Sequence, residues 1–198
     1  MLTDKDGKPL GRSEAEGIMK NRSSVTVSIF AAMLAICALI SNGNSSRILN
    51  NTIAINDLWG FYQAKSIKQT IAEQSRNQIA DNLAINGASM SVQIRERMQG
   101  QIAEFDADIA RYESDPRTNE GKRELMAQAR RLESERTVAK QRSPWYGMAS
   151  ATLQIAIVLS GTCVLGLSMM LLAGSIMFGT IGAALLANGY FLLFQWPL

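Results

Sequence analysis

The acidic side chains of Glu104, Asp106 and Asp108 form the densest group in the chain that could do chemistry. Clustered carboxylates can hold a divalent cation such as calcium. A calcium-binding loop also needs a turn glycine and a fixed ligand spacing, and neither accompanies these three residues. We therefore expect a solvated helix face there, with no metal and no cofactor bound.

Other side chains suited to catalysis are scarce. The sequence has no histidine, the commonest acid–base group and the commonest metal ligand. Its two cysteines, Cys37 and Cys163, lie in apolar runs, where we expect them to pack as small hydrophobic residues. No glycine-rich phosphate loop is present, because the sequence predicts no convincing strand to precede one. These observations predict a protein that is not an enzyme.

The C-terminal quarter carries the clearest structural signal. All 20 basic and 17 acidic residues precede Ser143, so no charged side chain follows it. One helix crosses the hydrocarbon core of a bilayer in about 20 residues, and the uncharged run is far longer than that. The run therefore predicts two transmembrane helices, at 145–166 and 170–194, joined by a short turn.

A further transmembrane helix is expected at 23–41, where the side chains are again apolar. We interpret it as a retained signal anchor that follows a polar, loosely ordered tail at 1–22. Lys20 and Arg22 precede it and favour a cytoplasmic N-terminus, which would place the long loop and the C-terminus outside. The basic residues before the next span favour the opposite orientation: Arg136, Lys140 and Arg142.

The segment 42–144 between the first two spans predicts an extramembrane helical domain. Serine, asparagine and glycine at 41–46 indicate a helix break, and a helix is expected over 45–86. This helix has two apolar faces, which is typical of a helix between neighbours. It must lie along the membrane surface or bend back, for example at Gly60, if the chain is to return to the bilayer.

An antiparallel helical hairpin is expected over 90–142. Apolar residues recur at spacings of three and four from Ile94 to Tyr112, as in a coiled coil. A turn follows at 115–121, where Pro116 and Gly121 oppose helix. A return helix of similar length completes the hairpin.

Aromatic and basic side chains mark places where the chain contacts the membrane boundary or a partner. Rings favour headgroup depth and ammonium groups favour phosphates. An ordinary helical core stripe is an equally good interpretation of the first group. The candidates are Trp59, Phe61, Tyr62, Lys65 and Lys68, with Trp145 and Tyr146 at the second span.

Small residues recur at every fourth position of the last span, which allows close helix packing. They are Ser175, Gly179, Ala183 and Ala187. Gln154 and Asn188 are expected to add hydrogen bonds between helices at membrane depth.

Three strings of the sequence resemble those of a known family. Only WGFYQAKSIKQ at 59–69 is specific, and the match extends to RYESDP at 111–116 and to LQIA at 153–156. The chain resembles the bacterial three-span membrane family catalogued as domain of unknown function four-three-three-seven, over most of residues 25–194. The resemblance implies three spans, a helical loop and a bacterial inner membrane. It carries no established activity.

The sequence therefore predicts an all-α integral membrane protein that acts by association. It would be a homo-oligomeric scaffold or an accessory subunit of a larger membrane complex, with lipid, copies of itself or other membrane subunits as partners. Nucleic acid is not expected as a partner, because basic and acidic residues are interleaved and the net charge is only +3. The alternative is an oligomeric channel or pore lined by Ser160, Thr162, Ser175 and Thr180.

Overall fold

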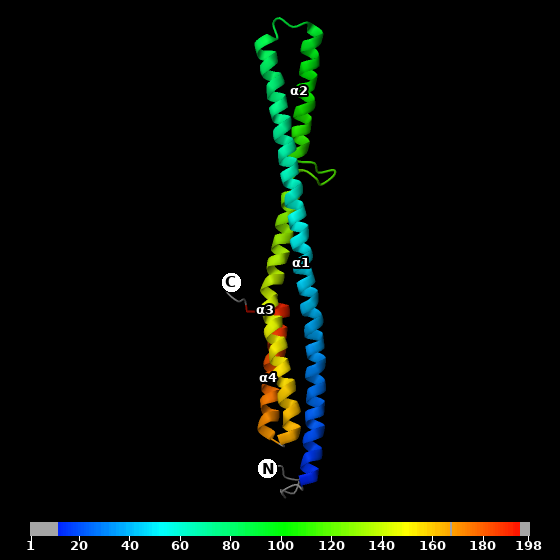
Figure 1. Ribbon diagram of the computed structural model, residues 1–198, viewed down its shortest axis with the longest axis vertical. Helices are drawn as coiled ribbons and strands as arrows, with labels where there is room; N and C mark the ends of the chain where they lie inside the picture. Colours follow the sequence, from blue (N-terminus) through cyan, green and yellow to red (C-terminus); the bar gives the residue numbers. More distant parts are fainter. Residues whose placement is uncertain (1–11, 167, 195–198) are drawn as a thin grey trace. The chain divides into compact units, whose positions relative to one another are not determined.

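The computed structural model describes residues 12–166 and 168–194, and these form four helices without a strand (Figure 1). The all-α prediction is therefore confirmed for this part of the chain. Gly87 lies between α1 and α2, and Pro116 and Gly121 lie between α2 and α3, where both residue types oppose helix. The helices are α1 (Arg12–Asn86), α2 (Val92–Glu113), α3 (Lys122–Gly166) and α4 (Met169–Phe191).

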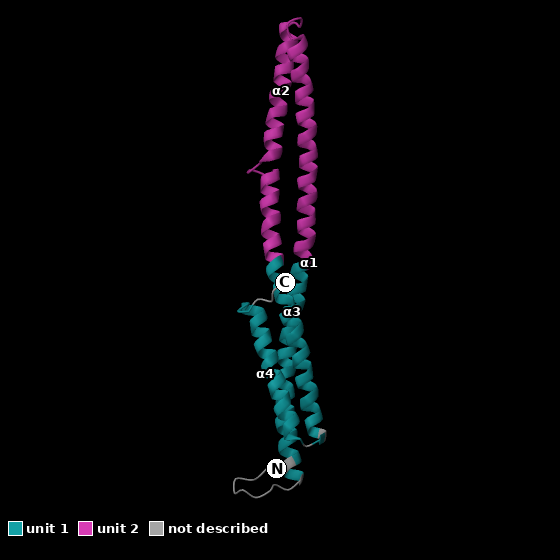
Figure 2. Cartoon of the chain, turned by 90° about the vertical axis from the view of Figure 1, so that its left-hand side faces the viewer, with its two compact units in different colours: residues 1–48, 137–198 teal, residues 49–136 magenta. Residues whose placement is uncertain are grey.

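The helices divide into two compact units (Figure 2). Unit 1 comprises residues 1–48 and 137–198, and unit 2 comprises residues 49–136. Both α1 and α3 contribute residues to each unit, whereas α2 belongs to unit 2 and α4 to unit 1. The helices α1, α3 and α4 are each long and apolar enough to cross a membrane, judged by length and composition.

Unit 1 packs the first part of α1, the second part of α3 and α4 side by side (Figure 2). Phe30, Cys37, Ala149, Leu153 and Ala156 form its buried centre. These residues come from α1 and α3, and partly buried side chains of α4 pack against them. Small residues at the centre let the helix backbones approach one another closely, as in helix packing within membranes.

Glycines of α4 occupy the closest approaches in unit 1. A Cβ atom at Gly179 would overlap the ring of Phe30 on α1. At Gly182 it would lie 2.8 Å from Cγ of Leu153, and at Gly189 it would lie 2.8 Å from Cε1 of Tyr146. Glycine is therefore required at these positions for the helices to pack as they do.

Unit 2 has an outward leg and a return leg (Figures 1 and 2). Residues 49–86 of α1 form the outward leg, and α2 followed by the first part of α3 forms the return leg. The turn at 87–91 connects α1 to α2, and Ser91 caps α2 by accepting a hydrogen bond from the Ile94 amide. The chain thus runs out along one helix and back along two helices in tandem.

The expected helix break at 41–46 is wrong, because α1 continues through it and also through Gly60 without bending back. Serine, asparagine and glycine each disfavour helix by about 1 kcal/mol or less, which tertiary packing can override. One such contact is the Asn44 side-chain amide, which donates to the Ala139 carbonyl at 2.8 Å.

The expected hairpin at 90–142 also differs from the structure. Instead of packing against each other along their lengths, α2 and α3 each pack against α1 (Figure 2). Arg76 of α1 meets Asp106 of α2 at 3.1 Å, and Trp59 of α1 meets Glu133 of α3 at 3.2 Å. The turn predicted at 115–121 is present, but it joins two successive helices instead of reversing the chain.

Two expected boundaries are displaced as well. The tail at 1–22 was expected to be loosely ordered, yet its described part from Arg12 belongs to α1, and Met19 is buried beside Cys163 and Leu172. Residues 1–11 lie outside the described residues. A helix was expected to start at the second span near 143–145, but α3 passes through Pro144 without ending.

Candidate functional site

Two of the three strings singled out in the sequence, at 59–69 and 111–116, meet where α2 ends and α3 begins. Lys65, from the first string, lies 5.8 Å from the centre of the Tyr112 ring, from the second string. Its ammonium group also pairs with Glu120 at 3.6 Å. Trp59 and Tyr62 stack edge to face at 5.4 Å on the same helix. We call this contact region of unit 2 the junction cluster; its members are Trp59, Tyr62, Lys65, Gln69, Tyr112, Glu113, Glu120, Lys122 and Glu133.

Lys122, in the first turn of α3, contacts three other members of the junction cluster, and we call it the hub of the cluster for this reason. Its ammonium group donates to Gln69 Oε1 at 3.0 Å and to Glu113 Oε2 at 3.1 Å. It also lies 5.7 Å from the centre of the Tyr62 ring. The Lys122 side chain is only 17% exposed, so water screens these contacts weakly. A single cation thus ties α1, the end of α2 and the start of α3 together.

The loop of residues 114–121 is held by carboxylates at both of its ends. Glu124 accepts hydrogen bonds from the Ser114 hydroxyl at 2.6 Å and from the Asp115 amide at 3.1 Å. Asp115 in turn accepts from the amides of Arg117 and Thr118 at 3.3 and 3.4 Å. Hydrogen bonds to the charged forms, chiefly from Ser114 to Glu124 and from Thr118 to Asp115, lower the pKa of both carboxyl groups.

A tight backbone closes the same loop. A Cβ atom at Gly121 would overlap Ser114 and Asp115 of the incoming chain. Asn119 has a φ of 58°, in the left-handed region that asparagine tolerates better than most residues. The loop therefore has one defined conformation, which fixes where α2 ends and α3 begins.

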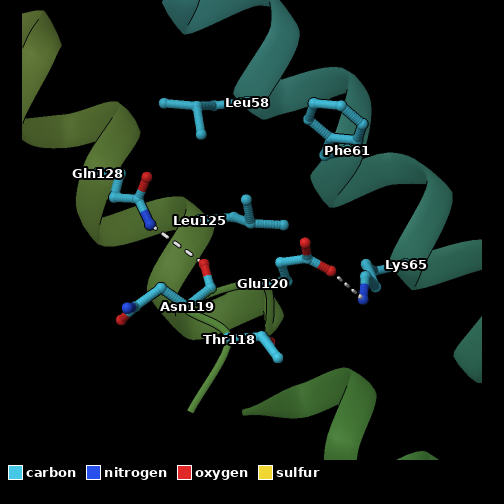
Figure 3. A pocket seen from close by; sticks show the side chains of 8 residues that line it. All are labelled: Leu58, Phe61, Lys65, Thr118, Asn119, Glu120, Leu125 and Gln128. Atoms are coloured by element: carbon cyan, nitrogen blue, oxygen red, sulfur yellow. Dashed lines mark hydrogen bonds and ion pairs between the residues drawn. The ribbon is translucent and has the colours of Figure 1, made fainter. Parts of the chain in front are cut away.

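A pocket of about 340 Å³ lies beside the junction cluster (Figure 3). Leu58, Phe61 and Leu125 form its apolar walls. The ion pair of Lys65 with Glu120 crosses one side of it, and on another side Gln128 donates to the Asn119 carbonyl at 3.1 Å. The lining therefore combines apolar walls with a few polar and charged groups, as ligand-binding pockets commonly do.

Two of the three acidic candidates of α2 have individual partners. Asp106 pairs with Arg76 of α1 at 3.1 Å, and Asp108 pairs with Arg111 of its own helix at 2.8 Å. Within the described ranges, no group of three His, Cys, Asp or Glu side chains is arranged to hold a metal ion. Asp106 and Asp108 therefore form ion pairs at the helix surface.

The aromatic and basic candidates of α1 do not share one face. Trp59, Tyr62 and Lys65 turn toward α2 and α3 within the junction cluster. Phe61 is 61% exposed beside the pocket, and Lys68 is also exposed. Trp59 and Phe61 are two positions apart and therefore lie on nearly opposite sides of a helix, so a common contact with headgroups by all five would require the helix to be surrounded.

The candidates of unit 1 also divide. Tyr146 is 1% exposed and packs on Gly189, whereas Trp145 is half-buried. On α4, the first two members of the stripe of small residues are buried and the last two are not: Ser175 and Gly179, then half-buried Ala183 and exposed Ala187. Sequence reasoning missed Gly182 and Gly189, which are buried on α4 together with Gly179. Gly182 follows Gly179 by three residues, and Gly189 follows Gly182 by seven.

Hydroxyl groups close the interior of unit 1. Ser23 of α1 contacts the carbonyl and the hydroxyl of Ser160 on α3, with 3.0 Å between the hydroxyl oxygens. Ser175 of α4 donates to the Ala156 carbonyl at 2.7 Å. Thr162 and Thr180 are exposed and bond to their own helices, so the four hydroxyls expected in a pore do not line one surface.

The two amides expected between helices bond locally instead. Asn188 donates to the Phe194 carbonyl at 3.1 Å and accepts from the Phe194 amide at 2.8 Å, which closes the C-terminal end of α4. Gln154 donates to Ser150 of the same helix at 3.4 Å. The amides therefore satisfy nearby polar groups, and the serines make the contacts between helices.

One face of α1 in unit 2 points away from α2 and α3. Its apolar side chains are more than half exposed, with values of 60% for Leu49, 52% for Ile53, 61% for Ile67 and 57% for Ile71. Ile55, on the opposite face of the same helix, is only 3% exposed. We call the exposed surface the outward face of α1. It corresponds to the second apolar face expected from the sequence.

Comparison with known proteins gives one match. No curated protein and no solved structure matches the chain. The family model described as domain of unknown function (DUF4337) matches residues 19–192, a range that includes all three strings singled out in the sequence. The chain therefore belongs to the DUF4337 family.

Proposed function

We propose that this chain is a membrane-anchored helical protein that acts by association, as a homo-oligomeric scaffold or an accessory subunit of a larger membrane complex. Its three apolar helices would cross a bacterial inner membrane. The N-terminus would be cytoplasmic, and unit 2 and the C-terminus would lie outside.

The observation that carries the proposal is the outward face of α1. Four large apolar side chains that are more than half exposed follow one another along this helix: Leu49, Ile53, Ile67 and Ile71. Apolar surface of this kind costs free energy in water, at about 25 cal/mol per Å². A second apolar face on a helix whose first face is already buried indicates a further partner.

The remainder of unit 2 supports association over catalysis. The junction cluster joins cations to carboxylates and rings, and its groups are used to hold helices together. The pocket beside it has apolar walls formed by Leu58, Phe61 and Leu125, which suit the binding of an apolar group. By holding α1 against α2 and α3, the junction cluster leaves the outward face of α1 exposed for a partner.

Purification from native membranes in a mild detergent tests the proposal. We expect the chain in a particle that contains several copies of it or other subunits. Ile67→Lys combined with Ile71→Lys should dissociate that particle, because two charges would be buried without partners. Val92→Lys is the matched control, since Val92 is 64% exposed but lies on α2. A monodisperse wild-type monomer would contradict the proposal.

A further inference from the structure

The outward face of α1 follows a seven-residue repeat. Ile53, Gly60 and Ile67 are spaced by seven, and all three are exposed. A second series, three residues later in each repeat, is also exposed. It consists of Asn56, Gln63 and Thr70. Alternating spacings of three and four are those of a helix that packs along a partner helix in a coiled coil.

Charges are absent from this repeat. Between residues 49 and 78 the helix carries five charged side chains, and none falls in either series. They are Asp57, Lys65, Lys68, Glu73 and Arg76. A neutral stripe can lie against an identical stripe without bringing like charges together. A charged partner would find nothing on it to pair with.

The polar members of the repeat are self-complementary. The amides of Asn56 and Gln63 each donate and accept hydrogen bonds, so each can pair with its own copy. A slip along the stripe would place these amides against isoleucine and leave them without partners, which selects the matched alignment. Between them, Gly60 has open space beyond it, since a Cβ atom there would meet no atom within 4 Å.

Other occupants fit less well. A helix that lies on a lipid surface places lysine or arginine along the borders of its apolar face. Here Asp57 and Lys68 lie on the same border with opposite charges, which gives no net attraction to anionic headgroups.

We infer that the outward face of α1 is the seam between two copies of this chain, packed parallel and in register through Ile53, Gly60 and Ile67. The inference rests on the proposed function, because two copies anchored in one membrane with one orientation are related by an axis along the membrane normal. Such an axis keeps equivalent residues at the same height. Each residue of the seam therefore meets its own copy.

Single cysteines test the inference in native membranes. Cys37 and Cys163 are buried, so the natural thiols form a low background. Gly60→Cys and Ile67→Cys should form disulfide-linked dimers upon mild oxidation, since equivalent seam positions come within disulfide reach. The matched controls are Phe61→Cys and Lys68→Cys, one residue further along the exposed helix. We expect about tenfold more dimer at the seam than at the controls.

The outcomes separate the two proposals. Equal crosslinking at all four positions, or none at any of them from a chain purified with other subunits, would overturn the seam and leave association standing. A wild-type monomer without partners would overturn both.

Discussion

Glycines and hydroxyl groups make close contacts between the helices of unit 1, whereas charged and aromatic side chains link the helices of unit 2. In unit 1, Gly179 lies under the Phe30 ring, and Ser175 bonds directly to a carbonyl of α3. In unit 2, Lys122 is shared by Gln69 and Glu113. Helices in lipid gain little from burying apolar surface, so close backbone approach replaces it. Ion pairs between side chains that water partly solvates suit the other unit.

The largest loss of stability is expected at Gly179 of unit 1, where the Phe30 ring leaves no space for a side chain. Gly179→Leu should destabilise the packing of α4 on α1 by about 1–3 kcal/mol or more, because the leucine side chain would occupy the place of the Phe30 ring. Gly161→Leu is the control, since Gly161 is exposed and has open space. Thermal unfolding in detergent measures both. Equal midpoints for the two variants would mean that close approach does not hold unit 1 together.

The next effect is expected in unit 2, at the loop between α2 and α3, where Gly121 lies against backbone atoms of the preceding chain. Gly121→Ala should cost about 1–3 kcal/mol, because backbone atoms of Ser114 and Asp115 cannot move as a flexible side chain can. Gly100→Ala, in the open interior of α2, should instead stabilise by about 0.5–1 kcal/mol through helix propensity. Hydrogen exchange of 114–121 reports the difference. Similar exchange in both variants would refute the tight loop.

A smaller effect is expected at the hub of the junction cluster. Lys122→Met should lower the free energy of unfolding of unit 2 by about 1 kcal/mol, and Glu113→Gln should cost little more once Lys122 is gone. Arg123→Met is the matched control, because Arg123 contacts the same carboxylate at 3.8 Å and is 72% exposed. Chemical unfolding followed by hydrogen exchange within unit 2 measures the set. A larger loss for Arg123→Met would reverse the assignment of the hub.

The smallest effect is expected from pH. The pKa of Glu124 lies below its ordinary value of 4.5, chiefly because Ser114 donates to its carboxylate. A lowered pKa adds stability that is complete above the ordinary value and is lost as the pH falls through the lowered one. Glu124→Gln should therefore weaken the 114–121 loop at neutral pH and approach wild type in acid. Glu135→Gln, which removes a pair within α3 only, should show no such convergence in the exchange of this loop.

Local signals predicted some boundaries of this fold and failed at others. Pro116 and Gly121 identified the loop, since both oppose helix strongly. Pro144 opposes helix equally, yet α3 continues through it while packed on α1, where Cys37 contacts the Tyr146 carbonyl at 3.5 Å. Packing of α3 on α1 outweighs the local effect of Pro144. A short stretch of sequence around Pro144 gives no information about that packing.

The candidate site was predictable only in its parts. The strings around Trp59 and Tyr112 were singled out from the sequence, and the structure brings them together. The role of Lys122 depends on Gln69, 53 positions away, and on Glu113 across a loop. Neither spacing is a helical repeat, so no periodicity could have indicated the hub.

The loop between α2 and α3 has a practical consequence for experiments on this protein. Each neighbouring helix pairs independently with α1, and the exposed turn around Arg117 lies between them. Additional sequence placed between Arg117 and Thr118 would separate the two amides that donate to Asp115. A fluorescent reporter or an affinity tag fused at this point would therefore disturb the loop that fixes the end of α2 and the start of α3, although the turn is exposed.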